Sequence, residues 1–157
     1  MHRAAVHGTA SRDYAADTLA QWAPMPISVA AISRFKANPE KELRFVAEID
    51  DVIVGFAAIV PKKEELRACY VSPEVAGRGV GRVLVAELER SARRIGLARL
   101  RLDSSLTAHP FYASLGYQAI SEGTHILGSG ARMACIHMRK ELAAPSLNRN
   151  TEDKESP

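Results

Sequence analysis

The sequence contains little cysteine and no long apolar run, and both absences narrow the class of protein. Its 157 residues include two cysteines, Cys69 and Cys135, which make neither a disulfide framework nor a metal-binding pattern. We interpret both as buried free thiols in a reducing compartment, which predicts a cytoplasmic protein. No stretch approaches the roughly 18 consecutive apolar residues of a membrane span, and no basic segment leads into an apolar core as in a signal peptide.

Charge of neither sign dominates the sequence. It has 21 Lys and Arg against 18 Asp and Glu, a formal net charge of +3, which is too mild to indicate nucleic-acid binding but would suit an anionic small ligand. Hydrophobic residues make up 46% of the sequence, enough for a sizeable core in a single domain. We expect that domain to span residues 1–142. The composition after Leu142 turns to Pro, Ser, Asn and charge, which predicts a disordered tail at 143–157.

The periodicity of the apolar residues predicts a mixed α/β domain. Two helices are expected first, at residues 11–23, capped by Ser11, and at 26–37. Further along, the spacing predicts strands at 44–49, 52–60, 65–71, 98–103, 117–126 and 131–140, with helices at 79–95 and 107–116. The first three strands should form an antiparallel meander, and residues 66–103 a parallel strand–helix–strand unit. We therefore expect a mixed, mostly antiparallel sheet of the α+β type with helices on both faces.

A glycine-rich segment stands between the third expected strand and the helix after it. Gly77, Gly79 and Gly81 alternate within AGRGVG, with Arg78 and Arg82 beside them. Glycines let a backbone approach an anion closely, and a helix N-terminus presents unpaired N–H groups, so this junction suits a phosphate. It does not match the dinucleotide fingerprint G-x-G-x-x-G, whose third glycine would fall on Arg82, and no Gly-Lys-Ser/Thr triplet is present. By itself the pattern fits a plain glycine-rich turn equally well.

A second motif follows after the helix. The segment PFYASLGY carries the adjacent aromatic pair Phe111 and Tyr112 and then Leu-Gly-Tyr at 115–117. Together with AGRGVG and the amphipathic helix, it resembles the GNAT family of acetyltransferases, whose pyrophosphate loop reads Gln/Arg-x-x-Gly-x-Gly/Ala. The resemblance covers residues 44–142. It implies the GNAT fold and direct transfer of an acetyl group from acetyl-CoA to an amine in a ternary complex.

The resemblance also implies a cofactor site. The backbone amides from Gly77 to Arg82 are expected to hold the pyrophosphate. Backbone groups near Cys69 and Val71 are expected to pair with the pantetheine arm and to polarise the thioester carbonyl. The residues expected to bind acetyl-CoA are Cys69, Val71, Ala76, Gly77, Arg78, Gly79, Val80, Gly81, Arg82 and Ser105. Ala76 stands where the family prefers Gln or Arg, and Ser105 stands where many members carry an Asn.

Two residues are expected to handle protons. The resemblance places Tyr112 at the family's usual general-acid position, beside the departing thiolate. A free tyrosine titrates near pH ~10 and a thiol near ~8.5, so a hydrogen bond to the sulfur describes the role better than full proton transfer. Without the motifs around it, Tyr112 would be interpreted as a core aromatic. Glu65, at the start of the third strand, lies where some relatives place a general base, although a solvated strand end explains it equally well.

The segment MHRAAVHGTAS at residues 1–11 contains no convincing strand, whereas members of the family usually begin with one. Loss of that strand would leave the strand at 44–49 with an exposed edge. An exposed apolar edge invites pairing with another chain. We therefore expect the first strand of the family to be missing and the protein to be a homodimer.

The leading hypothesis is a cytoplasmic N-acetyltransferase whose acceptor is a small-molecule amine. A protein N-terminus or lysine as the acceptor stays open, as does a non-catalytic acyl-CoA-binding module. His7, His125 and His137 have no metal-ligand spacing, so no metal is expected. Glu89 and Arg93 are spaced as a surface i,i+4 ion pair.

Overall fold

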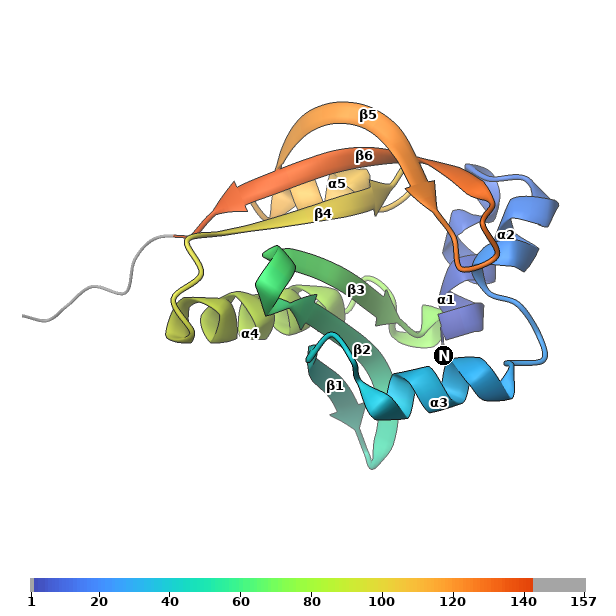
Figure 1. The fold of residues 1–157 in the computed structure, drawn as a ribbon, viewed down its shortest axis with the longest axis horizontal. Helices are drawn as coiled ribbons and strands as arrows, with labels where there is room; N and C mark the ends of the chain where they lie inside the picture. Colours follow the sequence, from blue (N-terminus) through green and yellow to red (C-terminus); the bar gives the residue numbers. More distant parts are fainter. Residues whose placement is uncertain (1, 143–157) are drawn as a thin grey trace, which may run out of the picture.

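The computed structural model describes residues 2–142, so the expected tail at 143–157 lies outside the described residues. These residues form five α-helices and six strands, joined in three places by short 3₁₀ turns (Figure 1). The helices are α1 (His2–Thr9), α2 (Ala16–Trp22), α3 (Val29–Ala37), α4 (Val80–Arg94) and α5 (His109–Ser114), and the turns are η1 (Ala10–Arg12), η2 (Pro61–Lys63) and η3 (Pro73–Val75). The strands are β1 (Leu43–Ile49), β2 (Val52–Val60), β3 (Glu65–Val71), β4 (Arg99–Ser105), β5 (Gln118–Ile126) and β6 (Arg132–Glu141). Within residues 2–142, no helix has both the length and the apolar character needed to cross a membrane.

The six strands belong to one mixed sheet in the order β1-β2-β3-β4-β6-β5. β1, β2 and β3 form the expected antiparallel meander, and β6 is antiparallel to both β4 and β5. β3 and β4 are parallel, but their ladder is limited to the pairing of Glu65 with Arg101 and a bond from Arg101 N to Glu64 O of 2.8 Å. Beyond that point the strands separate, and Figure 1 shows β1–β3 and β4–β6 as two halves of the molecule. The predicted mixed, mostly antiparallel sheet is confirmed.

Helices cover both faces of the half that contains β1, β2 and β3. Gly55 on β2 lies under α4, since a Cβ at this position would be 2.8 Å from the side chain of Leu84 and 3.2 Å from that of Val80. The next residue, Phe56, points to the opposite face. There its ring centroid lies 6.0 Å from that of Phe35 on α3. The absence of a side chain at Gly55 lets the N-terminal end of α4 pack close to the sheet, which positions the glycine-rich loop before it.

The N-terminal segment departs most from the sequence prediction. The single helix expected at 11–23 is divided into η1 and α2, and Ser11 lies inside η1 instead of capping a helix. The helix α1, which was not expected, precedes them. This segment has its own small core, formed by Val6, Ala10, Leu19 and Ala23. Helices this short depend on tertiary packing for their stability, so a local pattern does not fix their boundaries.

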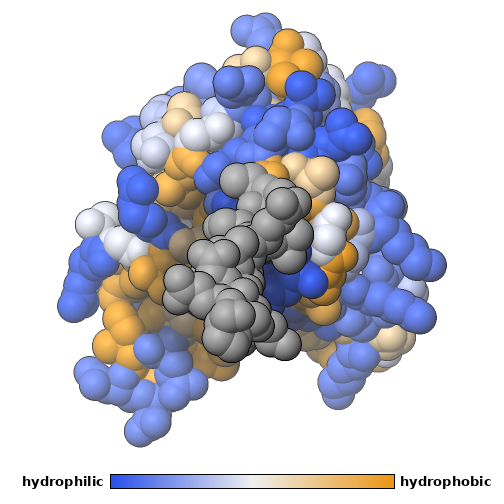
Figure 2. Space-filling view, turned by 90° about the vertical axis from the view of Figure 1, so that its left-hand side faces the viewer, coloured by the Kyte–Doolittle hydropathy of each residue, from blue (hydrophilic) through white to orange (hydrophobic). Residues whose placement is uncertain are grey.

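The sheet has an exposed edge at β1. No strand occurs among residues 2–42, so the strand with which family members usually begin is absent from the described residues, as expected. Val46 on β1 is 54% exposed, and Val52 and Ile53 at the start of β2 are 59% and 53% exposed. Figure 2 shows that apolar residues also gather in patches on a face of the molecule that is otherwise largely hydrophilic.

Glu89 is not the surface residue that its spacing predicted. It is buried, with 6% of its surface exposed. Lys140 Nζ on β6 donates to both of its carboxylate oxygens at 2.8 Å, and Arg93 Nη2 donates to one of them at 3.3 Å. The i,i+4 pair therefore exists, but it belongs to a buried group that joins α4 to β6. The sequence could not show this because Lys140 lies 51 residues further along.

Candidate active site

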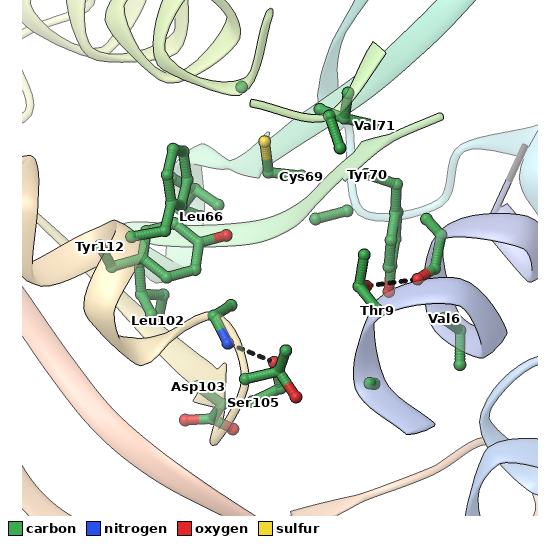
Figure 3. Close-up of a pocket in the computed structure, with 18 of the residues that line it drawn as sticks. Val6, Thr9, Leu66, Cys69, Tyr70, Val71, Leu102, Asp103, Ser105 and Tyr112 are labelled. Atoms are coloured by element: carbon green, nitrogen blue, oxygen red, sulfur yellow. Dashed lines mark hydrogen bonds between the residues drawn. The ribbon is translucent and has the colours of Figure 1, made fainter. Parts of the chain in front are cut away.

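The separation of β3 from β4 opens a cavity of about 580 Å³. Its walls come from the N-terminal segment, from β3, from the glycine-rich loop with the start of α4, and from the segment between β4 and α5. Figure 3 shows Cys69 of β3, Tyr112 of α5 and Ser105 of β4 around this space. The expected site residues that line it are Glu65, Cys69, Val71, Ala76, Gly77, Gly79, Val80, Gly81, Arg82, Ser105 and Tyr112. Arg78 is the one expected site residue that does not line it.

The glycine-rich loop presents free amides to this cavity. Gly77 and Gly79 have φ angles of 76° and 85°, in the left-handed region that favours glycine. A Cβ at either position would have no atom within 4 Å, so both residues border open space. Among the described residues, the amides of residues 79–82 have no protein acceptor, as expected for the first turn of a helix. The loop thus offers several N–H groups together with the positive end of the α4 dipole, an arrangement that suits a phosphate.

Tyr112 projects from α5 toward the space between β3 and β4 (Figure 3). It is 7% exposed, and its ring packs edge-on against those of Phe111 and Tyr117. Burial, assisted by the neighbouring Cys69, Tyr70 and Tyr117, raises the pKa of Tyr112 well above its ordinary value. The hydroxyl therefore stays protonated at neutral pH. The described residues give this hydroxyl no hydrogen-bond partner, so its proton is free for a group bound in the cavity.

Cys69 contributes to the site through its backbone. Burial raises the pKa of the Cys69 thiol to about 12. A thiol with such a pKa contains little thiolate at neutral pH, and the thiolate is the nucleophilic form. The residue lies on the edge of β3 from which β4 has separated, where no ladder pairs the backbone with β4. The strand edge at Cys69 is therefore open to a ligand with amide groups.

Two polar residues of the expected site are already bonded within the protein. Both carboxylate oxygens of Glu65 accept hydrogen bonds from Arg67, at 3.3 Å from Nε and 3.1 Å from Nη2. Arg67 also forms an ion pair with Glu40. Ser105 Oγ accepts a hydrogen bond from Ala108 N at 3.1 Å, which leaves the serine hydroxyl hydrogen to donate elsewhere. Glu65 is thus held by a cation, whereas Ser105 keeps one free donor.

The N-terminal segment closes one end of the cavity. Tyr14 Oη accepts a hydrogen bond from Leu106 N at 2.8 Å and donates to Ala134 O at 2.7 Å. Thr107 Oγ1 donates to Asp13 Oδ2 at 2.5 Å. These bonds join the segment to the β4–α5 connection and to β6. The lining residues that it supplies are Ala5, Val6, Thr9, Ala10, Arg12 and Trp22. No sequence motif marks this wall, and the sequence prediction did not include it.

A carboxylate bound to two histidines lies beside the cavity and was also missed. Asp103 on β4 accepts from His125 Nδ1 on β5 at 3.0 Å and from His137 Nδ1 on β6 at 2.8 Å. Asp103 and His125 line the cavity, whereas His137 does not. A possible metal-ligand atom on each of three residues, Asp103, Cys135 and His137, lies within 4.8 Å of the other two. The hydrogen bond between Asp103 and His137 accounts for this proximity, so we assign no metal. The three strands are separated in sequence, so residue spacing gave no signal for the group.

Known proteins share this fold. Residues 10–142 match the model of the acetyltransferase (GNAT) domain family. YafP of Escherichia coli strain K12, an uncharacterised N-acetyltransferase, is 30% identical over 118 residues, which cover 75% of this chain and 71% of YafP. A GCN5-related N-acetyltransferase from Rhodopseudomonas palustris has a TM-score of 0.80 at 29% identity, over 90% of this chain and 85% of its own. The PaiA N-acetyltransferase of Thermoplasma acidophilum, solved with coenzyme A, has a TM-score of 0.68 at 19% identity, over 89% and 87% of the two chains.

The chain belongs to the GNAT family and is an acetyl-CoA-dependent N-acetyltransferase. Members of this fold have been solved with coenzyme A and with acetyl-CoA. The residues present here fit that cofactor, because the unpaired amides of the loop suit its pyrophosphate and the open edge of β3 suits the amides of its pantetheine arm. The open space over Gly77 and Gly79 leaves room for the phosphates.

We expect Gly79→Asp to weaken coenzyme A binding at least about tenfold, or ~1.4 kcal/mol, because a carboxylate would stand where phosphate is expected. Gly79→Asn is the matched control, since asparagine has nearly the same size and both residues tolerate the left-handed backbone. Calorimetric titration measures the affinity, and circular dichroism checks the fold. Equal affinities of the two variants would show that the loop does not hold the phosphates.

Proposed function

We propose that the acceptor of this N-acetyltransferase is the amine of a small molecule. The observation that supports a small acceptor is the closed end of the cavity, where the N-terminal segment is bonded through Tyr14 to both Leu106 and Ala134. Small-molecule sites are concave and enclose most of their ligand, whereas an extended peptide needs an open groove. The wall also includes the rings of Trp22 and Tyr70, which offer apolar surface to a compact ligand.

Free-thiol release with acetyl-CoA against a panel of small amines, amino acids and peptides tests the acceptor class. We expect turnover with small amines and at least about tenfold lower kcat/KM with peptides that carry the same amine, because the closed end would exclude the rest of the peptide chain. The matched pair is an amino acid amide and a tripeptide that begins with that amino acid. Equal or better turnover of the tripeptide would contradict a small acceptor.

Bound acetyl-CoA supplies the activated acetyl group and a thiol leaving group. The unpaired amides of residues 79–82 would hold the pyrophosphate, the backbone of Cys69 and Val71 would orient the pantetheine arm, and Ser105 would donate its remaining hydrogen bond. Holding both reactants in one cavity makes the attack of the amine local. Tyr112 would donate its hydroxyl hydrogen toward the departing sulfur. Because the pKa of Tyr112 is raised, hydrogen-bond stabilisation describes this role better than complete proton transfer.

The raised pKa of Cys69 supports direct attack by the amine. A cysteine beside the cavity could in principle accept the acetyl group first, in a two-step reaction. That route needs a thiolate, and burial suppresses the thiolate of Cys69. A ternary complex of enzyme, acetyl-CoA and amine is therefore the mechanism that we propose.

Tyr112→Phe removes one hydroxyl and keeps the ring, so the packing against Phe111 and Tyr117 should survive. If the hydroxyl stabilises the departing thiolate, it acts mainly in the transition state, and kcat should fall at least about tenfold while coenzyme A affinity stays nearly unchanged. Steady-state kinetics and calorimetry measure the two quantities. Tyr117→Phe is the control, since it removes a hydroxyl from the neighbouring ring. A Tyr112→Phe protein with the kcat of the wild type, with chemistry rate-limiting, would exclude the role.

We also propose that the protein acts as a cytoplasmic homodimer paired through β1. The free thiols of Cys69 and Cys135 support a reducing compartment. The exposed edge at β1 and the exposed Val46 beside it support pairing between two copies.

Sedimentation at micromolar concentration should show a dimer of the full chain. Val46→Lys should shift it toward monomer, because a charge at the edge of a sheet opposes pairing with another chain. Val83→Lys on α4 is the control, since Val83 is 67% exposed and does not belong to the sheet. A monomeric wild type, or equal dissociation of both variants, would contradict pairing through β1.

A further inference from the structure

The carboxylate of Asp103 is held at both of its oxygens. His137 binds Oδ1 and His125 binds Oδ2, so neither oxygen is left to rotate freely. The ring of His137 occupies space that only a glycine leaves open, since a Cβ at Gly123 would lie 1.9 Å from its Nε2. Gly123 faces Cys135 across the β5–β6 pair, two residues before His137. The orientation of Asp103 is therefore built into the register of three strands.

Asp103 is ionised at neutral pH. Partial burial raises the pKa of Asp103, but the hydrogen bonds from His125 and His137 together lower it by more than burial raises it. The resulting pKa lies below the ordinary value. An ionised carboxylate can only accept hydrogen bonds. The Nδ1 atom of His125 must therefore carry the proton in the bond to Asp103. In the neutral imidazole this leaves a lone pair on Nε2.

Among residues 2–142, the His125 ring forms its hydrogen bond to Asp103 through Nδ1, and its Nε2 atom has no partner. His125 lines the cavity, and its side chain is 42% exposed. An imidazole with a free Nε2 and an Nδ1–H bound to a carboxylate is the arrangement in which histidine accepts a proton from a reactant.

Glu65, the base suggested by the family resemblance, is less suited to this task. Arg67 donates to both of its oxygens, at 3.3 Å and 3.1 Å. Protonation of this carboxylate would weaken its bonds to a cation. The Nε2 atom of His125 has no such bond to lose.

We propose that His125 is the general base that deprotonates the acceptor amine and that Asp103 is its positioning residue. The inference rests on the proposed direct attack by an amine. The ammonium nitrogen of the acceptor gives up two protons on its way to the amide. Nε2 of His125 takes the first before the C–N bond forms. The nitrogen gives up the second when the C–S bond breaks, and this proton accounts for the one that the departing sulfur gains, so that coenzyme A leaves as the thiol. His125 then returns its proton to solvent, so one proton is released for each acetyl group transferred.

The experiment compares His125→Gln and Asp103→Asn with the wild type, using whichever amine or peptide the wild type acetylates best. His125→Gln should lower kcat/KM at neutral pH at least about 100-fold, the usual range for general base catalysis, with coenzyme A affinity unchanged by calorimetry. Asp103→Asn should lower it at least about tenfold. His109→Gln is the matched control, because His109 does not line the cavity, and it should keep the activity of the wild type.

The pH profile separates a base from a structural residue. Without a base, only amine that is already deprotonated in solution reacts, and that fraction rises roughly tenfold per pH unit below the pKa of the amine. The defect of His125→Gln should therefore shrink steadily as the pH rises. A structural role would lower the rate by one factor at every pH. The titratable groups on the neighbouring elements include Asp103 on β4, Cys135 and His137 on β6, and Asp13 and Tyr14 before α2. The same strands also carry Arg99 and Arg101 on β4, Glu122 on β5, and Arg132, Arg139, Lys140 and Glu141 on β6.

A second measurement does not depend on activity. Nitrogen NMR of the histidine rings should show the Nδ1–H tautomer for His125 in the wild type and its loss in Asp103→Asn. The proposal is overturned if His125→Gln keeps the rate of the wild type, if its defect is constant with pH, or if His137→Gln is the more damaging variant. Failure of the small-acceptor proposal would appear differently, as a preference of the wild type for peptides.

Discussion

The site depends on one constraint in the sheet, which is that β3 and β4 pair only at their beginnings. The ladder between these parallel strands is confined to Glu65 and Arg101, and the strands then separate. Backbone groups that lose a strand partner need another one, since unpaired buried N–H and C=O groups are costly. The separation therefore creates both a cavity and a strand edge that is ready to pair with an extended ligand. Tyr112 reaches this space from α5.

The two halves of the sheet are joined by side-chain contacts in addition to the short β3–β4 ladder. Lys140 on β6 is bonded to the buried Glu89 on α4, so a helix that packs on one half is joined to a strand of the other. The N-terminal segment contacts both halves, because Tyr14 bonds to β6 and to the loop after β4, and Trp22 Nε1 donates to Tyr70 Oη on β3 at 3.4 Å. Close packing of α4 over Gly55 sets the position of the unpaired amides in the glycine-rich loop. The cavity thus lies between two halves that are joined on either side of it.

The chemistry is divided between these walls. The loop before α4 and the edge of β3 offer backbone groups, which suit a cofactor with phosphates and amides. The residues that we propose for proton transfer, Tyr112 and His125, come from the half that contains β4, β5 and β6. An amine that enters from the side of Asp103 would therefore meet its base before it meets the acetyl group. This division explains why the glycine-rich loop has a readable motif, whereas the proposed acceptor side is assembled from scattered side chains.

The sequence alone determined the sheet, the central helix and the glycine-rich loop, because each depends on local periodicity or on glycines at alternate positions. Its second motif also singled out Tyr112, which the structure places at the cavity. The division of the first predicted helix, the burial of Glu89 and the Asp103–His125 pair were decided by tertiary structure. The N-terminal segment packs around its own small core of Val6, Ala10, Leu19 and Ala23. For Glu89 and Asp103 the partners lie far apart in the chain, as with Lys140 or the three strands around Asp103, and their contact follows from strand order and register. Only folding brings such residues together, so no spacing in the sequence records them.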